Sequence, residues 1–378
     1  MRSGLSLRLG ALLTLFATIG FASSASAATT NADVRRGLER LVRAPGGPLG
    51  AIATLNRGGE LTVLRAGQAD VKKKAAPRAT DHMRIASVAK AFNGAVALTL
   101  VRAGKLGLDD TIGQRLTGMP AAWSAVTVRQ MLNHTSGLPD YTQSKGFVEQ
   151  AQKKPHGYVS PRTIISWVAK DPLEFTPEST YEYSNTDNIV VGLIVEAVTG
   201  GTYTQALEQI VFGPTGLRQT SLPTKAALPS PYIHGYQVAP GEKPADVSTA
   251  LSPSGAWASG GIVSTPANLN TFIRSYLGLK YFDKAQQEQQ MRWFVGGKSS
   301  PPGPGKNSAG LALFRYQSKC GTVYGHTGNF PGYTQWAAAT ADGSRSVTTS
   351  LNIPAPKGKL LAQLRGVQAS AVCALLGK

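Results

Sequence analysis

Acidic residues are scarce in this 378-residue sequence, which has 21 Asp and Glu against 39 Lys and Arg and a formal net charge of +18. Such an excess of positive charge suggests a nucleic-acid partner, but that class of protein needs basic residues interleaved with aromatic residues on one face. The densest basic run, Lys72-Lys73-Lys74 with Arg78, has no aromatic neighbour. A solvated loop is the simpler interpretation of this run, and we predict no nucleic-acid partner.

Metal-binding patterns are missing as well. The sequence has no HExxH segment, and its histidines show no metal-ligand spacing. They are His82, His134, His156, His234 and His326. We therefore predict neither a metal nor another cofactor. The rest of the composition, 42% hydrophobic and 16% charged, is that of a globular chain of one or two domains.

Long apolar runs are absent except at the N-terminus, where Leu9 to Phe21 is uncharged. Two arginines precede this run and Ala25-Ser26-Ala27 follows it, a pattern typical of a signal peptide. The run is short for a membrane span, and no cysteine stands at the cleavage site for a lipid anchor. We predict a signal peptide at 1–27 and a secreted chain, periplasmic or extracellular, without a membrane anchor. We expect this chain to be a monomer whose basic surface attracts anionic cell-wall polymers.

Cysteine is rare, with only Cys320 and Cys373 present. An even pair in an oxidising location is most simply interpreted as a disulfide. Closing that loop would stabilise the fold by roughly 4 kcal/mol in the chain-entropy model. The alternative is two unrelated buried thiols.

Strand and helix patterns occur in blocks along the chain. A helix is predicted at 31–45, and the turn at Gly58-Gly59 joins two predicted strands, 49–56 and 60–66, as a hairpin. Residues 105–280 are predicted to be mostly helical, and a Gly/Pro/Ser-rich loop follows near 296–309. Four strands and a last helix are predicted at 310–316, 321–325, 333–341, 345–352 and 358–376. These blocks predict an α/β (α+β) fold in which both chain ends complete one antiparallel sheet.

The first candidate site is Ser87-Val88-Ala89-Lys90, at the start of a helix predicted over 87–103. Positions i and i+3 share a helix face, so the Lys90 amine can reach the Ser87 hydroxyl. The helix is apolar on nearly every side, which predicts burial. Burial lowers the pKa of a lysine, which could then take the serine proton, and free N–H groups at the helix start could bind an oxyanion. The alternative is a serine N-cap followed by a surface lysine.

Two further segments could contribute to a site. Tyr183-Ser184-Asn185 precedes a helix predicted over 185–199, so a core tyrosine and a helix cap are the alternative. His326-Thr327-Gly328, followed by Asn329, ends a strand pattern. A glycine there lets a ligand approach the backbone, and the neighbouring side chains can donate hydrogen bonds. The alternative is a strand that simply ends in a turn.

In this order, the three segments resemble the S-x-x-K, Y-x-N and K/H-T-G signature of the serine β-lactamase and penicillin-binding-protein superfamily. Segments 104–110, 132–138 and 260–265 are similar to its low-molecular-weight branch. The HTG form, together with cysteines at 320 and 373, is similar to soluble secreted D-alanyl-D-alanine carboxypeptidases, which carry a disulfide at the matching positions.

The resemblance implies a β-lactamase/DD-peptidase-like fold. We expect an antiparallel sheet of about five strands flanked by helices, with an inserted, mainly helical region. Residues 28–80 and 262–378 would form the sheet domain and 81–261 the helical domain, with the active site between them.

The resemblance also implies roles for the motif residues. Ser87 would be the nucleophile, and Lys90 and Tyr183 would transfer protons, Tyr183 to the leaving group. The backbone N–H groups of Ser87 and Asn329 would form the oxyanion hole. Substrate recognition would come from Asn185, His326, Thr327, Gly328 and Asn329, whereas His134 is expected to be structural.

The sequence departs from those carboxypeptidases at two positions. Asn329 stands where they have Thr, and Phe314 stands where they carry the arginine that binds the substrate carboxylate. Arg315 follows one residue later and is our candidate for that role. Because side chains alternate across a strand, Arg315 would reach the substrate only through a bulge.

The expected function is hydrolysis of peptidoglycan peptides ending in D-Ala-D-Ala through an acyl-Ser87 intermediate, with transpeptidation when an amine competes with water. Other small acyl substrates are also compatible with this chemistry, and β-lactams would be covalent ligands. The alternatives are a class C-like β-lactamase or short-chain esterase, and a non-catalytic penicillin-binding sensor. A class A β-lactamase is disfavoured because no Glu-x-x-Leu-Asn segment supplies a deacylating carboxylate.

Overall fold

The computed structural model describes residues 1, 29–239 and 241–378. Residues 2–28 lie outside the described residues, and they include all of the predicted signal peptide, residues 1–27, except Met1. Its presence, and with it secretion, stays a prediction.

An eight-stranded antiparallel sheet forms the centre of the molecule, in the order β2-β1-β12-β11-β10-β9-β8-β7. The strands are β1 Gly50–Arg57, β2 Glu60–Gly67, β7 Phe294–Val295, β8 Lys306–Gly310, β9 Leu313–Ser318, β10 Gly321–Phe330, β11 Tyr333–Ala339 and β12 Arg345–Leu351. The fold class and the completion of the sheet by both chain ends are confirmed. The division into two domains at the expected boundaries stays a prediction.

The expected count of about five strands is wrong. Six of the eight strands correspond to the predicted strand segments, and the other two, the edge strand β7 and its neighbour β8, lie around the Gly/Pro/Ser-rich segment that was expected to be a loop. Strand β9 begins three residues later than expected because Leu311 and Ala312 form a tight turn between β8 and β9, with Ala312 at a φ of 49°. Glycine and proline mask β-propensity in the sequence, and pairing with β9 provides the hydrogen bonds that make β8 a strand.

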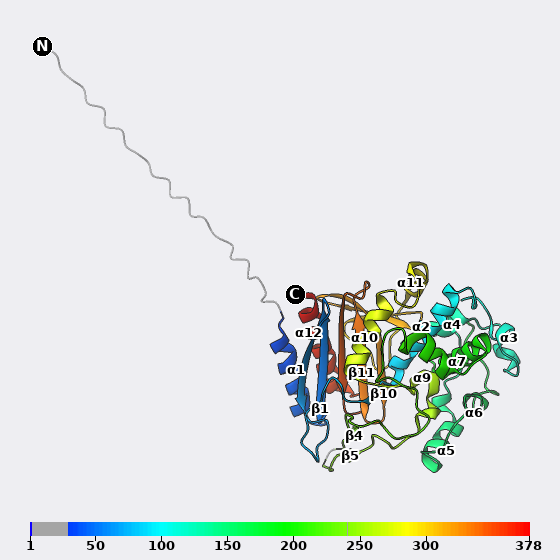
Figure 1. Ribbon diagram of the computed structural model, residues 1–378, viewed down its shortest axis with the longest axis horizontal. Helices are drawn as coiled ribbons and strands as arrows, with labels where there is room; N and C mark the ends of the chain where they lie inside the picture. Colours follow the sequence, from blue (N-terminus) through cyan, green and yellow to red (C-terminus); the bar gives the residue numbers. More distant parts are fainter. Residues whose placement is uncertain (2–28, 240) are drawn as a thin grey trace.

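Helices cover both faces of the sheet (Figure 1). Helices α1 (Asn31–Arg43) and α12 (Gly358–Leu376) pack on one face and on each other. On the other face, α10 (Pro266–Leu277) contacts the central strands. The apolar side chains of α1, Val34, Leu38 and Leu41, recur at helical spacing and are fully buried, so the burial of one stripe fixes this helix.

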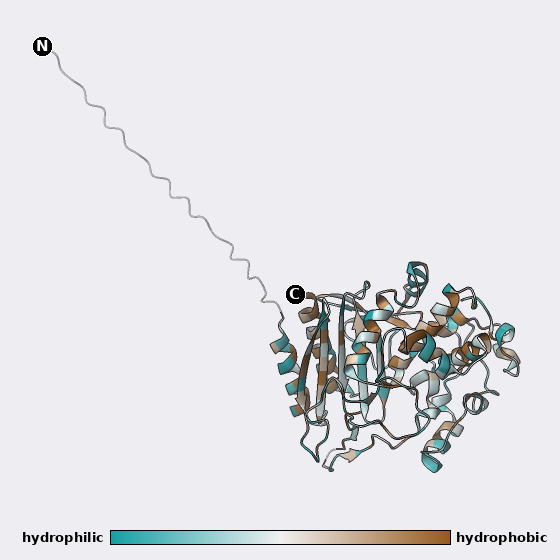
Figure 2. Cartoon of the chain, in the orientation of Figure 1, coloured by the Kyte–Doolittle hydropathy of each residue, from teal (hydrophilic) through white to brown (hydrophobic). Residues whose placement is uncertain are grey.

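The helical part of the chain lies beyond α10. Its central helices are α2 (Ala89–Arg102) and α7 (Asn185–Thr199), which are buried over most of their length and contact each other. Shorter helices surround them: α3 Ile112–Arg115, α4 Val128–Leu132, α5 Lys145–Lys153, α6 Pro161–Ser166, α8 Tyr203–Leu207, α9 Trp257–Gly260 and α11 Lys284–Gln290. In Figure 2 the apolar colour gathers on the strands and the inner helices.

Within residues 29–239 and 241–378, no single helix combines the length and the apolar composition that a membrane span requires. Only the bent pair Asn185–Thr199 and Tyr203–Phe212 meets both conditions, and only jointly.

Two short sheets complete the fold. Strand β3 (Met83–Arg84) pairs with β6 (Val263–Ser264), and β4 (Tyr236–Gln237) pairs with β5 (Ala245–Asp246). The β3–β6 pair is important for the site because the chain passes from β3 directly into the turn that holds Ser87.

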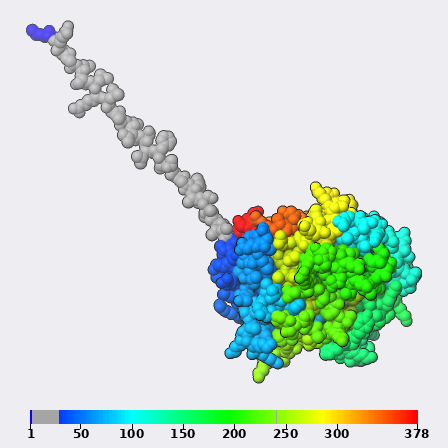
Figure 3. All heavy atoms as spheres, in the orientation of Figure 1, coloured from blue at the N-terminus to red at the C-terminus, as the bar shows by residue number. Residues whose placement is uncertain are grey.

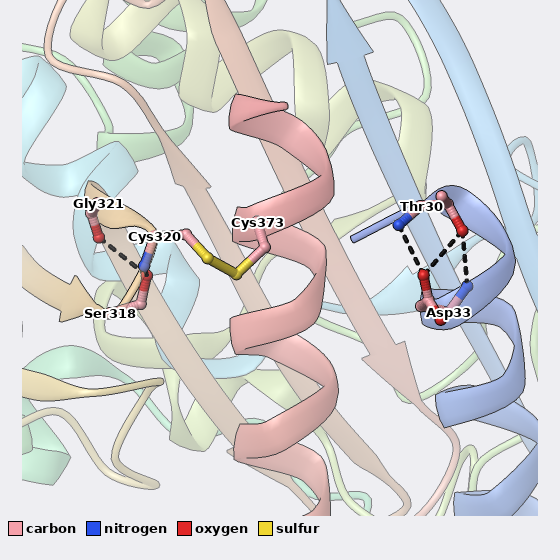
Figure 4. The surroundings of a disulfide bond; sticks show 6 residues. All are labelled: Thr30, Asp33, Ser318, Cys320, Gly321 and Cys373. Carbon is pink, nitrogen blue, oxygen red and sulfur yellow. Dashed lines mark hydrogen bonds between the residues drawn. A yellow bond between two sulfur atoms is a disulfide. The ribbon is translucent and has the colours of Figure 1, made fainter. Parts of the chain in front are cut away.

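The predicted disulfide is confirmed: Cys320 and Cys373 are bonded, with their Cα atoms 5.0 Å apart. Cys320 lies in the turn between β9 and β10, and Cys373 lies in the last turns of α12 (Figure 4). The bond therefore joins the final helix to the sheet. The first and last described elements lie on the same side of the molecule (Figure 3), where the amide of Thr29 donates to the carbonyl of Lys378 at 3.0 Å.

Candidate active site

Ser87 lies in a turn of 3-10 helix, Ala86–Val88, that leads into α2. The helix predicted from Ser87 therefore begins two residues later, at Ala89. A Cβ on Gly328 of β10 would lie 2.6 Å from the Ile85 carbonyl oxygen and 2.9 Å from the Ser87 amide nitrogen. Only glycine lets β10 approach the serine turn this closely, so the HTG segment and Ser87 meet through their backbones.

Lys90 is fully buried, one helical turn after Ser87. Its Nζ contacts three oxygens, those of the Ser87 hydroxyl at 2.9 Å, the Asn185 side chain at 2.8 Å and the Ser259 carbonyl at 2.7 Å. Burial lowers the pKa of Lys90 to about 7, against the opposing effect of Asp140 and Asp187. A neutral amine has two hydrogens and one lone pair. It could donate to Asn185 and Ser259 and accept the proton of Ser87.

Tyr183 lies on the other side of the lysine, with its ring centre 5.0 Å from Lys90 Nζ. Its hydroxyl oxygen is buried and has no hydrogen-bond partner among the described residues. Burial raises the pKa of Tyr183 far above its usual range, and the nearby Ser87 hydroxyl opposes this shift. Tyr183 therefore holds its proton, and its O–H is free to donate to a substrate atom.

A buried set of hydrogen-bonded side chains packs against Tyr183. His134 Nδ1 lies 2.7 Å from an oxygen of Asp187, and Ser136 donates to the other oxygen of that carboxyl group. The His134 ring centre is 4.4 Å from that of Tyr183. Burial lowers the pKa of His134 to about 3, so its ring is neutral. His134 does not line the cavity, which agrees with the structural role expected for it.

Asp140 is a site residue that sequence reasoning missed. One of its carboxylate oxygens accepts from Asn185 Nδ2 at 2.9 Å, and the other accepts from the amide and hydroxyl of Thr142, each at 3.0 Å. Asn185 thus connects Asp140 to Lys90. A single carboxylate in a loop has no periodicity or spacing that would mark it in the sequence.

His326 and Thr327 do not line the cavity. His326 is buried, and its Nδ1 lies 2.6 Å from the Thr327 carbonyl oxygen. Burial and the charge of Lys90 lower the pKa of His326 well below its usual range. The Thr327 hydroxyl donates to the Pro301 carbonyl at 2.7 Å. The expected direct contacts of both side chains with a substrate are therefore not supported by their positions.

Arg315 also lies away from the cavity, which corrects its proposed role as a carboxylate ligand. Strand β9 pairs with both neighbours without a bulge around this residue. Arg315 Nη2 donates to Ser308 Oγ at 3.1 Å, and its guanidinium lies 5.1 Å from the ring centre of Trp293. Phe314, on the opposite face, packs on His326. Regular alternation along the strand keeps Arg315 from the serine.

Asn329 lines the cavity, but its side chain is already engaged, because its Oδ1 accepts from the amide of Ala355 at 2.7 Å. The position of this residue is compatible with a backbone contribution to an oxyanion hole.

A cavity of about 560 Å³ opens over Ser87. Its aromatic wall consists of Tyr141, Phe147 and Trp167, which pack on one another, with Phe330 on the sheet side. Asp140 is the one charged side chain among the described residues that line it, and none of them is Lys, Arg or His. The described residues also contain no group of three His, Cys, Asp or Glu that could hold a metal ion.

Comparisons with curated proteins find partial matches. The chain is 29% identical to Penicillin-binding protein 4* of Bacillus subtilis over 175 residues, which cover 45% of this chain and 38% of that relative. The match thus spans less than two fifths of the length of this curated relative.

Solved structures match over most of the chain. A D-stereospecific amidohydrolase from Streptomyces sp. is 29% identical with a TM-score of 0.77, covering 85% of this chain and 94% of that one. The D-amino acid amidase of Ochrobactrum anthropi SV3, in complex with L-phenylalanine, is 24% identical with a TM-score of 0.78, covering 91% and 97% of the two chains. The second likeness shows the fold alone.

The family comparison covers almost the whole of the described fold. The Beta-lactamase family model matches residues 38–369, a range that includes Ser87, Lys90, Tyr183 and the HTG segment. Together with the geometry around Ser87, this match identifies the chain as a member of the Beta-lactamase family, within the superfamily of β-lactamase and penicillin-binding-protein-like serine hydrolases.

Proposed function

We propose that this serine hydrolase cleaves amides or esters of amino acids that carry a free amino group, through an acyl-Ser87 intermediate. The observation that carries the proposal is the charge of the cavity, in which Asp140 is the one charged lining side chain among the described residues. A carboxylate without a cationic neighbour in the cavity is suited to a substrate ammonium group.

In the proposed acylation, neutral Lys90 takes the proton of Ser87 as the serine oxygen attacks the substrate carbonyl carbon. The negative charge that develops on the carbonyl oxygen faces the backbone N–H groups of Ser87 and Asn329. As the bond to the leaving group breaks, Tyr183 gives its proton to the departing nitrogen or oxygen, and Lys90 returns a proton to Tyr183. Water then hydrolyses the acyl-enzyme with the same groups in the reverse order.

The aromatic wall supports an apolar side chain on the substrate. Tyr141, Phe147 and Trp167 pack edge to face or tilted, with ring centres 5.6 to 6.4 Å apart. Such a surface can bury an aromatic or aliphatic side chain while Asp140 holds the amino group. The D-stereospecific amidohydrolase from Streptomyces sp., at 29% identity, supports amide hydrolysis.

The second candidate is the D-Ala-D-Ala carboxypeptidase activity expected from the sequence motifs. Similarity to Penicillin-binding protein 4* of Bacillus subtilis favours it. The cavity argues against it, because a free C-terminal carboxylate would be buried without a cation and Arg315 does not reach it.

The test compares D- and L-phenylalanine amide with their N-acetyl forms and with diacetyl-Lys-D-Ala-D-Ala. We expect a higher kcat/KM for the free amino group, by about 10- to 100-fold, because a charged hydrogen bond contributes about 1.5–3 kcal/mol. In the Asp140→Asn variant this preference should disappear while the N-acetyl amide keeps its rate relative to other neutral donors.

The N-acetyl amide is the internal control, because it reports any disturbance of Asn185 and Lys90 by the substitution. Equal rates on free and N-acetylated amides would contradict the proposal. Release of D-Ala from the diacetyl tripeptide as the faster reaction would establish the carboxypeptidase. A fluorescent penicillin separates the remaining alternatives, because rapid turnover indicates a β-lactamase.

A further inference from the structure

Residues 298–305, which we name the strap, lie between β7 and β8, and Ser300 of the strap lines the active-site cavity. The fold holds the first half of the strap through three hydroxyl groups. The pairs are Tyr181 Oη to the Lys298 carbonyl at 2.7 Å, Tyr316 Oη to Ser299 Oγ at 3.1 Å, and Thr327 Oγ1 to the Pro301 carbonyl at 2.7 Å.

The second half of the strap is fixed to α12. Arg365 donates to the carbonyl oxygens of Gly303 at 2.9 Å and Gly305 at 2.7 Å. A Cβ on Gly303 would lie 2.3 Å from the ring of Tyr316, so the strap lies flat against that ring. Because both halves are hydrogen-bonded to the surrounding fold, the strap is fixed in place, and Ser300 is its contribution to the wall of the cavity.

The contacts place this wall beside the reacting groups. Thr327, which holds Pro301, directly precedes the glycine that packs on the Ser87 amide. Tyr181, which holds Lys298, lies two residues before Tyr183. Ser300 is exposed and lines the cavity together with Ser87, Tyr183 and Asn329. Ser300 therefore shares the cavity with Tyr183, the residue that would protonate the leaving group.

The Ser300 side of the cavity is poor in groups that could bind an anion. The hydroxyls of Thr327 and Tyr316 are already used to hold the strap. Arg315 is turned to Ser308 and Trp293, and Lys298 is not among the cavity-lining residues. A carboxylate on the leaving group would lose water there without gaining a cationic partner, which is costly.

We infer that the strap is a specificity element that admits small, uncharged leaving groups, such as ammonia or a short alcohol, and excludes leaving groups that carry a free carboxylate. This inference rests on the proposed acyl-Ser87 chemistry but not on the preference for a free amino group. According to this inference, residues 298–305 determine whether the enzyme hydrolyses simple amides and esters or peptides with a free C-terminus.

The experiment compares three leaving groups on one acyl donor: phenylalanine amide, phenylalanyl-alanine and phenylalanyl-alanine amide. The two dipeptides have similar size and differ in the charge of the C-terminus. Each is assayed with a free and an N-acetylated amino group, in the wild type, in Ser300→Arg, and in the size-matched neutral control Ser300→Gln. A further variant replaces residues 299–302 by two glycines.

For the wild type we expect the simple amide to react at least about 100-fold faster than the free dipeptide. The reason is that the carboxylate of the dipeptide would lose more than one charged hydrogen bond to water without a replacement. The Ser300→Arg variant should raise the ratio of free dipeptide to dipeptide amide about tenfold, whereas Ser300→Gln should not. The shortened strap should raise the rates of both dipeptides relative to the amide.

A wild type that cleaves the free dipeptide as fast as the amide would overturn the inference. So would a ratio that Ser300→Arg leaves unchanged. Ser300 is exposed, so this variant does not depend on whether the shortened strap folds. Failure of the proposed amino-group preference would appear separately, as equal rates for the free and N-acetylated forms with any given leaving group.

Discussion

At the residue scale, the chemistry of the site depends on the burial of Lys90. Among the described residues, its amine is hydrogen-bonded to a hydroxyl, an amide oxygen and a backbone carbonyl, and to no carboxylate. The cost of burying a charge is therefore only partly offset, and the pKa of Lys90 falls to about 7. The helix α2 that carries Lys90 is buried on nearly every side. This burial explains both the apolar sequence of the helix and the lowered pKa of Lys90.

The titration of Lys90 predicts the pH dependence of the reaction. Its amine is protonated below pH 7 and neutral above, so kcat/KM should rise with pH around a midpoint near 7. Tyr183 has a pKa far above its usual range and adds no descending limb in the neutral range. For free-amino substrates, loss of the ammonium charge should lower the rate above about pH 8.

The measurement is kcat/KM against pH for phenylalanine amide and its N-acetyl form. The first profile should be bell-shaped, whereas the second should reach a plateau. A profile of the N-acetyl amide that is flat from pH 5 to about 9 would show that Lys90 is not the titrating base.

Single residues also show where sequence reasoning succeeds and where it stops. The motifs predicted that Ser87, Lys90, Tyr183 and Asn185 come together, and the structure places the other three side chains around the Lys90 amine. Asp140 was missed, because its importance comes from being the one charged side chain among the described residues of a cavity wall that only the fold creates.

At the element scale, the strap and the two strands that flank it, β7 and β8, were the part least accessible from sequence. A segment rich in Gly, Pro and Ser predicts a loop, and no local pattern shows that hydroxyls of Tyr181, Tyr316 and Thr327 will fix it. The Tyr181 contact joins residues more than a hundred positions apart, whereas the Tyr316 and Thr327 contacts join residues fewer than thirty positions apart. Only tertiary packing brings them together, and it also removes Thr327 from the cavity.

The disulfide gives an element-scale prediction. Replacing both Cys320 and Cys373 by Ser should lower the free energy of unfolding by roughly 4 kcal/mol, because the unfolded chain gains the freedom of an open loop. The destabilisation should be largest for α12, which the bond joins to the β9–β10 turn. Urea unfolding of the oxidised wild type and of the double variant measures it. Equal unfolding midpoints would contradict the account.

At the scale of the whole molecule, the two ends of the chain build the sheet and the middle builds the helical part. Strand β1 pairs with β2 on one side and with β12 on the other, so the first and last strands lie side by side. The site forms where the middle returns to the sheet, and segments near residues 87, 140, 183 and 328 contribute to it. Alternating strand patterns at both ends were enough to predict this arrangement, whereas the number of strands was not.

The strong positive charge belongs to the surface rather than to the cavity. The net charge is +18, yet the described residues that line the cavity include no Lys, Arg or His. We propose that this surface attracts anionic wall polymers once the chain is exported. Export through the signal peptide, and the monomeric state, stay predictions.

The central claim is that Ser87 becomes acylated. The most direct test is the intact mass of the protein after rapid mixing with phenylalanine methyl ester, or with a penicillin, followed by peptide mapping. The account predicts one acyl group on Ser87, no adduct in Ser87→Ala, and accumulation that falls below pH 7 as Lys90 becomes protonated. Turnover of the ester with no adduct, or an adduct on another residue, would contradict it.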